Sequence, residues 1–154
     1  MRGLWPTNLS ELKFSEYLNS LCFYSLFVYL YTTMEKQRKI ILFKFIKFVK
    51  DTLKINTEFK VKLSSNHDGF TTTAYYNNDE KLVAVYTKGR AIVDILRSVA
   101  HEMVHMKQHE DGKIKGPIKD VGGPEENEAN ARAGSLIKQF GYNLKKEKID
   151  IYSL

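Results

Sequence analysis

The apolar positions divide the chain into helical and extended segments. Over residues 36–54 they recur every three or four residues, which predicts an amphipathic helix with lysines on its other face. The period then changes to two. Residues 59–63 alternate apolar and basic side chains, residues 70–76 are rich in Thr and Tyr, and residues 82–86 are apolar. These segments predict three strands, with a hairpin turn at Asn77-Asn78-Asp79.

Helical spacing returns from Arg90 to about Glu110. A polar loop with four glycines then runs from residue 111 to 123, and Pro124 suits the first turn of a last helix, which we expect to end before Gly141. The pattern as a whole predicts an α+β fold. In it a small, mostly antiparallel sheet packs on the helix of residues 90–110. The apolar stripe of that helix comprises Ile92, Ile95, Leu96, Val99 and Met103.

Residues 1–33 have few charges and differ from the rest of the chain. Their apolar stretch, residues 21–31, is too short to span a bilayer, which needs about 20 residues, and no signal-peptide cleavage pattern follows it. Met34 opens a more ordinary beginning. We therefore expect a single domain over residues 34–154. The first 33 residues are then an extra packing helix, which we favour, a membrane-interface anchor, or a segment upstream of the true start.

The composition limits the classes of partner and compartment. The net charge of +6 comes mostly from lysines spread along the chain, which is typical of a solvated surface. Nucleic acid lacks a supporting motif, and membrane contact through residues 21–31 or 40–53 is the minority interpretation. The single Cys22 excludes an intramolecular disulfide and a thiolate-rich zinc site, and favours a reduced, cytoplasmic setting. The preference for Lys over Arg suits an AT-rich genome, viral or bacterial.

The strongest chemical signal is the HExxH motif His101-Glu102-Met103-Val104-His105 on the predicted helix. Two His separated by four residues project from one helix face, about one turn apart, within reach of one ion. Zinc accepts imidazole nitrogens at about 2.0–2.1 Å and leaves a position for water. Glu102 adjoins the first His and is placed to take a proton from that water. We predict one zinc per chain.

A catalytic zinc needs a third protein ligand. The next helix offers three carboxylates, Glu125, Glu126 and Glu128, and the loop offers Asp120. Residues 126–130 read Glu-Asn-Glu-Ala-Asn and follow His105 by 21 positions.

In these features the chain resembles the gluzincins, zinc peptidases whose third ligand is a Glu on a helix after HExxH, often within E-x-x-A-N. The gap resembles that of thermolysin-like enzymes, and ImmA/IrrE-type peptidases carry a similar pattern. The resemblance covers roughly residues 70–141. It implies a zincin-like fold, with Glu126 as the third ligand and Asn130 orienting a ligating imidazole.

Other zinc families fit less well. Metzincins need Gly and His where Gln108 and Asp111 stand, and a deformylase needs a Cys shortly before the motif. The chain also lacks room for the second domain with which thermolysin-like enzymes stabilise the oxyanion. Candidate substitutes for that role, or for substrate contact, are Tyr75, Tyr86, Arg90 and His109, with His67, Tyr76 and Tyr142 as further candidates.

The predicted function is that of a zinc metallopeptidase, a hydrolase of peptide bonds in a peptide or protein substrate. Glu102 serves as the general base. One alternative is a non-catalytic, zinc-binding regulatory or interaction module. Another is a nucleic-acid-associated protease similar to the SprT-like enzymes. The sequence leaves open the substrate, the pathway, the oligomeric state and the oxyanion-stabilising residue.

Overall fold

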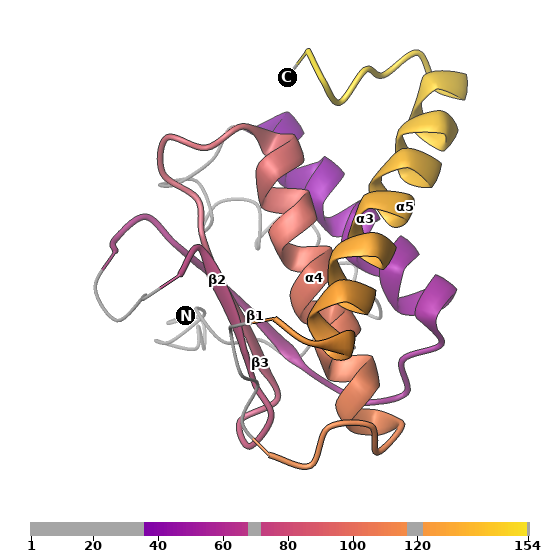
Figure 1. The fold of residues 1–154 in the computed structure, drawn as a ribbon. Coiled ribbons are helices and arrows are strands. Elements are labelled where there is room, and N and C mark those ends of the chain that lie inside the picture. Colours follow the sequence, from indigo (N-terminus) through magenta and orange to yellow (C-terminus); the bar gives the residue numbers. More distant parts are fainter. Residues whose placement is uncertain (1–35, 68–71, 117–121, 154) are drawn as a thin grey trace, which may run out of the picture.

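A computed structural model describes residues 36–67, 72–116 and 122–153 and confirms the α+β fold (Figure 1). The N-terminal segment with Cys22, together with Phe70 and Asp120, lies outside the described residues. In chain order the elements are α3 (Lys36–Leu53), β1 (Lys60–Ser64), β2 (Ala74–Asn77), β3 (Leu82–Tyr86), α4 (Ile92–Glu110) and α5 (Pro124–Lys146).

The sheet is mixed rather than mostly antiparallel. Its strand order is β1-β3-β2, with β2 antiparallel and β1 parallel to the central strand β3. The alternating pattern indicated which residues share a face of the sheet, but it carries no information on strand direction. Strand direction depends on how the strands are connected, and here β1 and β2 lie on opposite sides of β3.

The predicted hairpin joins β2 to β3. The Oδ1 atom of Asn77 accepts hydrogen bonds from the backbone N–H groups of Asp79 and Glu80, at 2.9 and 3.1 Å. Lys81 completes the turn with a positive φ of 52°. An Asn side chain that binds the backbone two residues later is a standard way to initiate a turn, which explains why the sequence signal was sound.

The helices gather on one side of the sheet, with α4 at the centre (Figure 1). Helix α4 packs on β2 and β3 and also contacts α3 and α5. All five residues of its predicted apolar stripe are fully buried. The apolar face of α3, including Leu42, Phe45 and Val49, is buried in the same core. Among the described residues, no helix combines the length and apolar character needed to cross a bilayer.

Helix α5 continues past Gly141 to Lys146, so the predicted end at that glycine was wrong. Gly141 is buried, and a Cβ atom placed there would lie 3.4 Å from Cδ1 of Ile151. A contact at this distance is ordinary van der Waals packing, so the glycine neither terminates the helix nor is required by its neighbours.

Candidate metal centre

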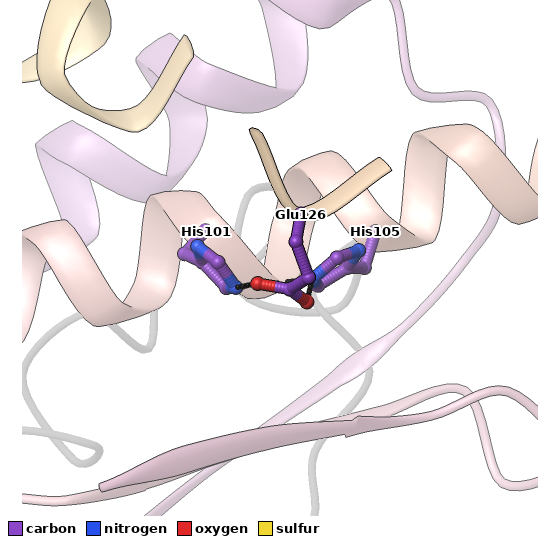
Figure 2. A group of neighbouring side chains, drawn as sticks. All are labelled: His101, His105 and Glu126. Carbon is purple, nitrogen blue, oxygen red and sulfur yellow. Dashed lines mark hydrogen bonds and ion pairs between the residues drawn. The ribbon is translucent and has the colours of Figure 1, made fainter. Parts of the chain in front are cut away.

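The HExxH motif lies in the middle of α4. The apolar stripe of this helix is buried in the core, which fixes the direction in which the opposite face of the helix points. His101 and His105 project from that face, one turn apart (Figure 2). Their Nε2 atoms are 3.0 Å apart. The ring of His105 is almost completely buried, and the ring of His101 retains 20% of its surface exposed. This leaves the pair open to solvent on the His101 side only.

Glu126, in the first turn of α5, completes the group. Its Oε1 lies 2.8 Å from Nε2 of His105, and its Oε2 lies 3.3 Å from Nε2 of His101 (Figure 2). One ligand atom from each of these three residues lies within 4.8 Å of the other two. Within the described part of the chain, no other set of three His, Cys, Asp or Glu residues meets this condition. The structure thus brings together the three side chains that the sequence predicted as metal ligands.

The orientation of His105 is set by Gln108, one turn further along α4. The Nδ1 atom of His105 lies 2.8 Å from Oε1 of Gln108. The Gln108 amide nitrogen donates to two oxygens, the backbone carbonyl of Glu125 and the carboxylate of Glu128, both at 3.0 Å. The amide oxygen therefore faces the ring, and Nδ1 of His105 must carry the proton. The lone pair of His105 Nε2 is then directed at Glu126 and His101.

Asn130 lies one turn after Glu126 on α5 and is close enough to His101 to affect the pKa of its ring. Its role in orienting that imidazole, which the family resemblance implied, stays a prediction. Burial lowers the pKa of His101, and the neighbouring His105 lowers it further, while Glu126 and Asn130 act in the opposite direction. The net lowering of the pKa favours the neutral imidazole, which is the form that binds metals.

The three groups fit a zinc ion in both chemistry and spacing. Two imidazoles and one carboxylate are a known ligand set of catalytic zinc. Ligand atoms at about 2.0–2.1 Å around a tetrahedral ion lie about 3.3–3.4 Å from one another. Nε2 of His105 lies 3.0 Å from Nε2 of His101 and 2.8 Å from Oε1 of Glu126, both slightly shorter than that spacing, and the 3.3 Å to His101 is measured from the other carboxylate oxygen, Oε2. With only three protein ligands, a fourth position would remain for water or substrate.

Glu102 is 9% exposed and sits beside His101 on α4. It contributes no atom to the three-residue group. This placement is consistent with a carboxylate that adjoins a metal without binding it.

The remaining acidic residues of α5 have other contacts. The Glu128 carboxylate pairs with Lys113 at 3.1 Å and with Arg132 at 3.3 Å, in addition to its bond from Gln108. Glu125 contributes its backbone carbonyl to Gln108. Of the three candidate carboxylates, only Glu126 is directed at the His pair.

Tyr75 and Tyr86, predicted as oxyanion or substrate contacts, lie on the sheet face away from α4. In β2, Ala74 and Tyr76 are buried in the helix-side core, so the intervening Tyr75 points to the opposite face. Tyr86 follows Val85 of that core, and its ring contacts His67 with centroids 4.2 Å apart. The structure thus brings neither tyrosine to the three-residue group.

Arg90 and His109 are engaged at the two ends of α4. The Arg90 guanidinium donates to the backbone carbonyl of Tyr86 at 2.8 Å and to Oγ of Ser98 at 2.7 Å. It therefore links the end of β3 to the first turns of α4. The ring of His109 packs edge-on against Tyr76, with centroids 5.8 Å apart. Burial and nearby Lys81 lower the pKa of His109, so its uncharged ring suits this packing role.

The sequence analysis did not identify Gln108 as part of the site. Its spacing of three residues from His105 was a usable signal, because such pairs are neighbours on a helix surface. The contact of Gln108 with α5 depends on tertiary structure, so the spacing alone could not predict it.

Comparisons of this chain with models of known protein families, with curated proteins and with solved structures gave no significant match. The case for a function therefore rests on the chemistry of the site.

Proposed function

We propose that this protein is a zinc-dependent peptidase. The observation that carries the proposal is the convergence of His101, His105 and Glu126 from two helices, with buried Glu102 adjoining the group on α4. A purely structural zinc site has four protein ligands that fill every coordination position, and it needs no neighbouring carboxylate. Three ligands plus a carboxylate outside the set suit hydrolysis instead.

Zinc, when bound, lowers the pKa of a water towards about 7 and polarises a carbonyl group. The residues of the chain supply the rest. His105, Glu126 and His101 would hold the ion, with the His105 ring almost completely buried and the Glu126 and His101 side chains 15% and 20% exposed. Glu102 accepts the proton of the attacking water and donates it to the departing amine, which is general acid–base catalysis by one carboxylate.

The sheet supports the choice of an extended peptide as substrate. Strand β2 packs beside α4 and pairs only with β3 among the described strands. We propose that an extended substrate adds to the other edge of β2, next to the metal helix. A peptide added to such an edge gains main-chain hydrogen bonds while its side chains are read by pockets.

The deciding experiment compares the parent with Glu102→Gln on a broad peptide library, together with metal analysis of both proteins. The amide keeps the shape of the side chain but cannot accept the proton. We expect about one zinc per chain in both and a loss of cleavage of at least about 10²–10⁴-fold in the variant. Glu80→Gln, an exposed change in the hairpin, is the matched control and should cleave like the parent.

Two results would oppose the proposal. If the parent cleaves nothing in the library while zinc is bound, a binding module becomes the better explanation. If Glu102→Gln loses the zinc, Glu102 supports the ion directly and is not a free base.

A further inference from the structure

Gln108 is the polar residue that joins the two helices behind the candidate metal centre. It is 1% exposed and makes three hydrogen bonds, to His105, to the backbone of Glu125 and to Glu128. A buried primary amide has two donor hydrogens and one acceptor oxygen. All three are used. Rotation of the amide by 180° would place its N–H donors against the Nδ1–H of His105 and its oxygen against the oxygens of Glu125 and Glu128.

This arrangement has a consequence for the His105 ring. Since the amide oxygen must face Nδ1, the tautomer with the proton on Nδ1 is the one that the fold stabilises. An imidazole in the other tautomer would present a lone pair to the amide oxygen and an N–H to the ion site. The hydrogen bond to the buried amide is lost in that tautomer, and this loss biases the ring towards the form with the proton on Nδ1.

The same amide also acts on the third ligand. Its donor bond to the Glu125 carbonyl fixes the backbone directly before Glu126, and its bond to Glu128 fixes the helix turn directly after it. Lys113 and Arg132 hold the Glu128 carboxylate from the far side. One side chain therefore sets both the ring of the second His and the position of the Glu that faces it.

We propose that Gln108 is a positioning residue, which presets the protonation pattern of His105 and its spacing from Glu126 before a metal binds. The proposal rests on the proposed metal centre but not on peptidase activity. It goes beyond a packing role, since packing alone would leave the tautomer and the affinity for metal unchanged.

The test uses the full chain and three single variants. Gln108→Leu removes all three hydrogen bonds at similar volume. Gln108→Glu keeps an acceptor for Nδ1 of His105 but loses both donors and places a charge beside Glu128. Gln139→Leu is the matched control, because this Gln on α5 is exposed and bonds only Ser135 among the contacts found for it. Adding Glu128→Gln to Gln108→Glu restores a donor–acceptor pair with the direction reversed.

Three measurements separate the roles. Long-range ¹H–¹⁵N NMR of the metal-free protein reports the tautomer of His105. Competition with a chelator reports zinc affinity, and urea unfolding of the metal-free protein reports stability. We expect Gln108→Leu to give mixed tautomers and to weaken zinc binding roughly 10–100-fold, as for other groups that support a metal ligand. We expect Gln108→Glu to keep the Nδ1–H tautomer with weakened binding, and the double variant to recover most of that affinity.

The proposal is overturned if Gln108→Leu retains the parent tautomer and binds zinc as tightly as Gln139→Leu, even if its stability falls. Should Gln108→Leu fail to fold, Gln108→Glu and the double variant decide the question through affinity and tautomer. A parent that binds zinc but cleaves no peptide would remove the peptidase function and leave the Gln108 result standing. Unchanged behaviour of both Gln108 variants in a protein that cleaves peptides would remove only the positioning role.

Discussion

Helix α4 carries two polar clusters that differ in one respect. The three-residue group of His101, His105 and Glu126 lies at its middle. At its C-terminal end, Glu110 binds the chain between α3 and β1. Oε1 of Glu110 accepts from the backbone N–H groups of Asn56 and Thr57 and from the Thr57 hydroxyl, at 2.8 to 3.0 Å. Its Oε2 pairs with Lys107 at 3.0 Å.

The difference lies in the balance of donors and acceptors. Every partner of Glu110 brings a proton or a positive charge, so that cluster is complete within the protein. In the three-residue group, Nε2 of His105 and both Glu126 oxygens are acceptors directed at one point, and Nε2 of His101 lies there too. Converging acceptors repel one another unless a cation lies between them. The comparison indicates that one cluster serves the fold, and it supports our proposal that the other binds a cation.

The largest expected contrast concerns metal content. His105→Ala or His101→Ala should abolish stoichiometric zinc, because two ligands no longer hold a catalytic ion. Glu110→Ala should keep about one zinc per chain. Elemental analysis of the purified proteins measures this directly. Full occupancy in both His variants would show that the ion, if any, is bound elsewhere.

The next contrast lies within α5. Glu126→Ala removes a direct bond to the ion and should weaken zinc binding by more than the roughly 100-fold upper range for supporting residues. Glu125→Ala, one position earlier, keeps the backbone carbonyl that Gln108 uses and should bind zinc like the parent. Chelator competition ranks the variants. If Glu128→Ala weakened zinc binding more than Glu126→Ala, the assignment of Glu126 as the third ligand would be wrong.

A smaller effect is expected at Asn130, which neighbours His101 and is not one of the three grouped ligands. Asn130→Ala should weaken zinc binding roughly 10–100-fold, as expected for a residue that orients a ligand. Asn130→Asp, which keeps the acceptor, should lose less. An effect as large as that of His101→Ala would mean that Asn130 is itself a ligand.

The smallest effect concerns stability. Burial by itself raises the pKa of Glu110, but bonds from Lys107, Thr57 and Asn56 outweigh it and hold the pKa below the ordinary 4.5. A lowered pKa in the folded state means that ionised Glu110 stabilises the fold above pH 4.5, and that this contribution is lost as the pH falls through the folded-state pKa. Glu110→Gln should cost about 1–3 kcal/mol near neutral pH.

Urea unfolding of the parent and Glu110→Gln at several pH values checks this. The difference between the two free energies of unfolding should shrink on acidification below pH 4.5. A difference that stays constant with pH would show that the carboxylate charge is not what stabilises the loop. Zinc binding by Glu110→Gln should equal that of the parent at neutral pH.

Local patterns in the chain were sufficient to predict several features. The bounds of β3, the stripe of α4 and the hairpin at Asn77 depend on periodicity or on contacts within a few residues. The His pair is of the same kind, because a spacing of four residues on one helix defines its geometry without help from the rest of the molecule. The predicted helix end at Gly141 was wrong, because Leu144 beyond it is buried in the core and tertiary packing extends the helix.

The tertiary structure decided what depends on two elements at once. Sequence placed several carboxylates on the helix after the motif, and the family resemblance favoured Glu126. Only the packing of α5 on α4 turns Glu126 toward the His pair and Glu128 toward Gln108. The direction of β1 and the contacts of Gln108 are decided in the same way. Side-chain spacing along one helix is fixed by its 3.6-residue repeat, whereas the rotation and offset between two helices depend on how their whole buried faces pack.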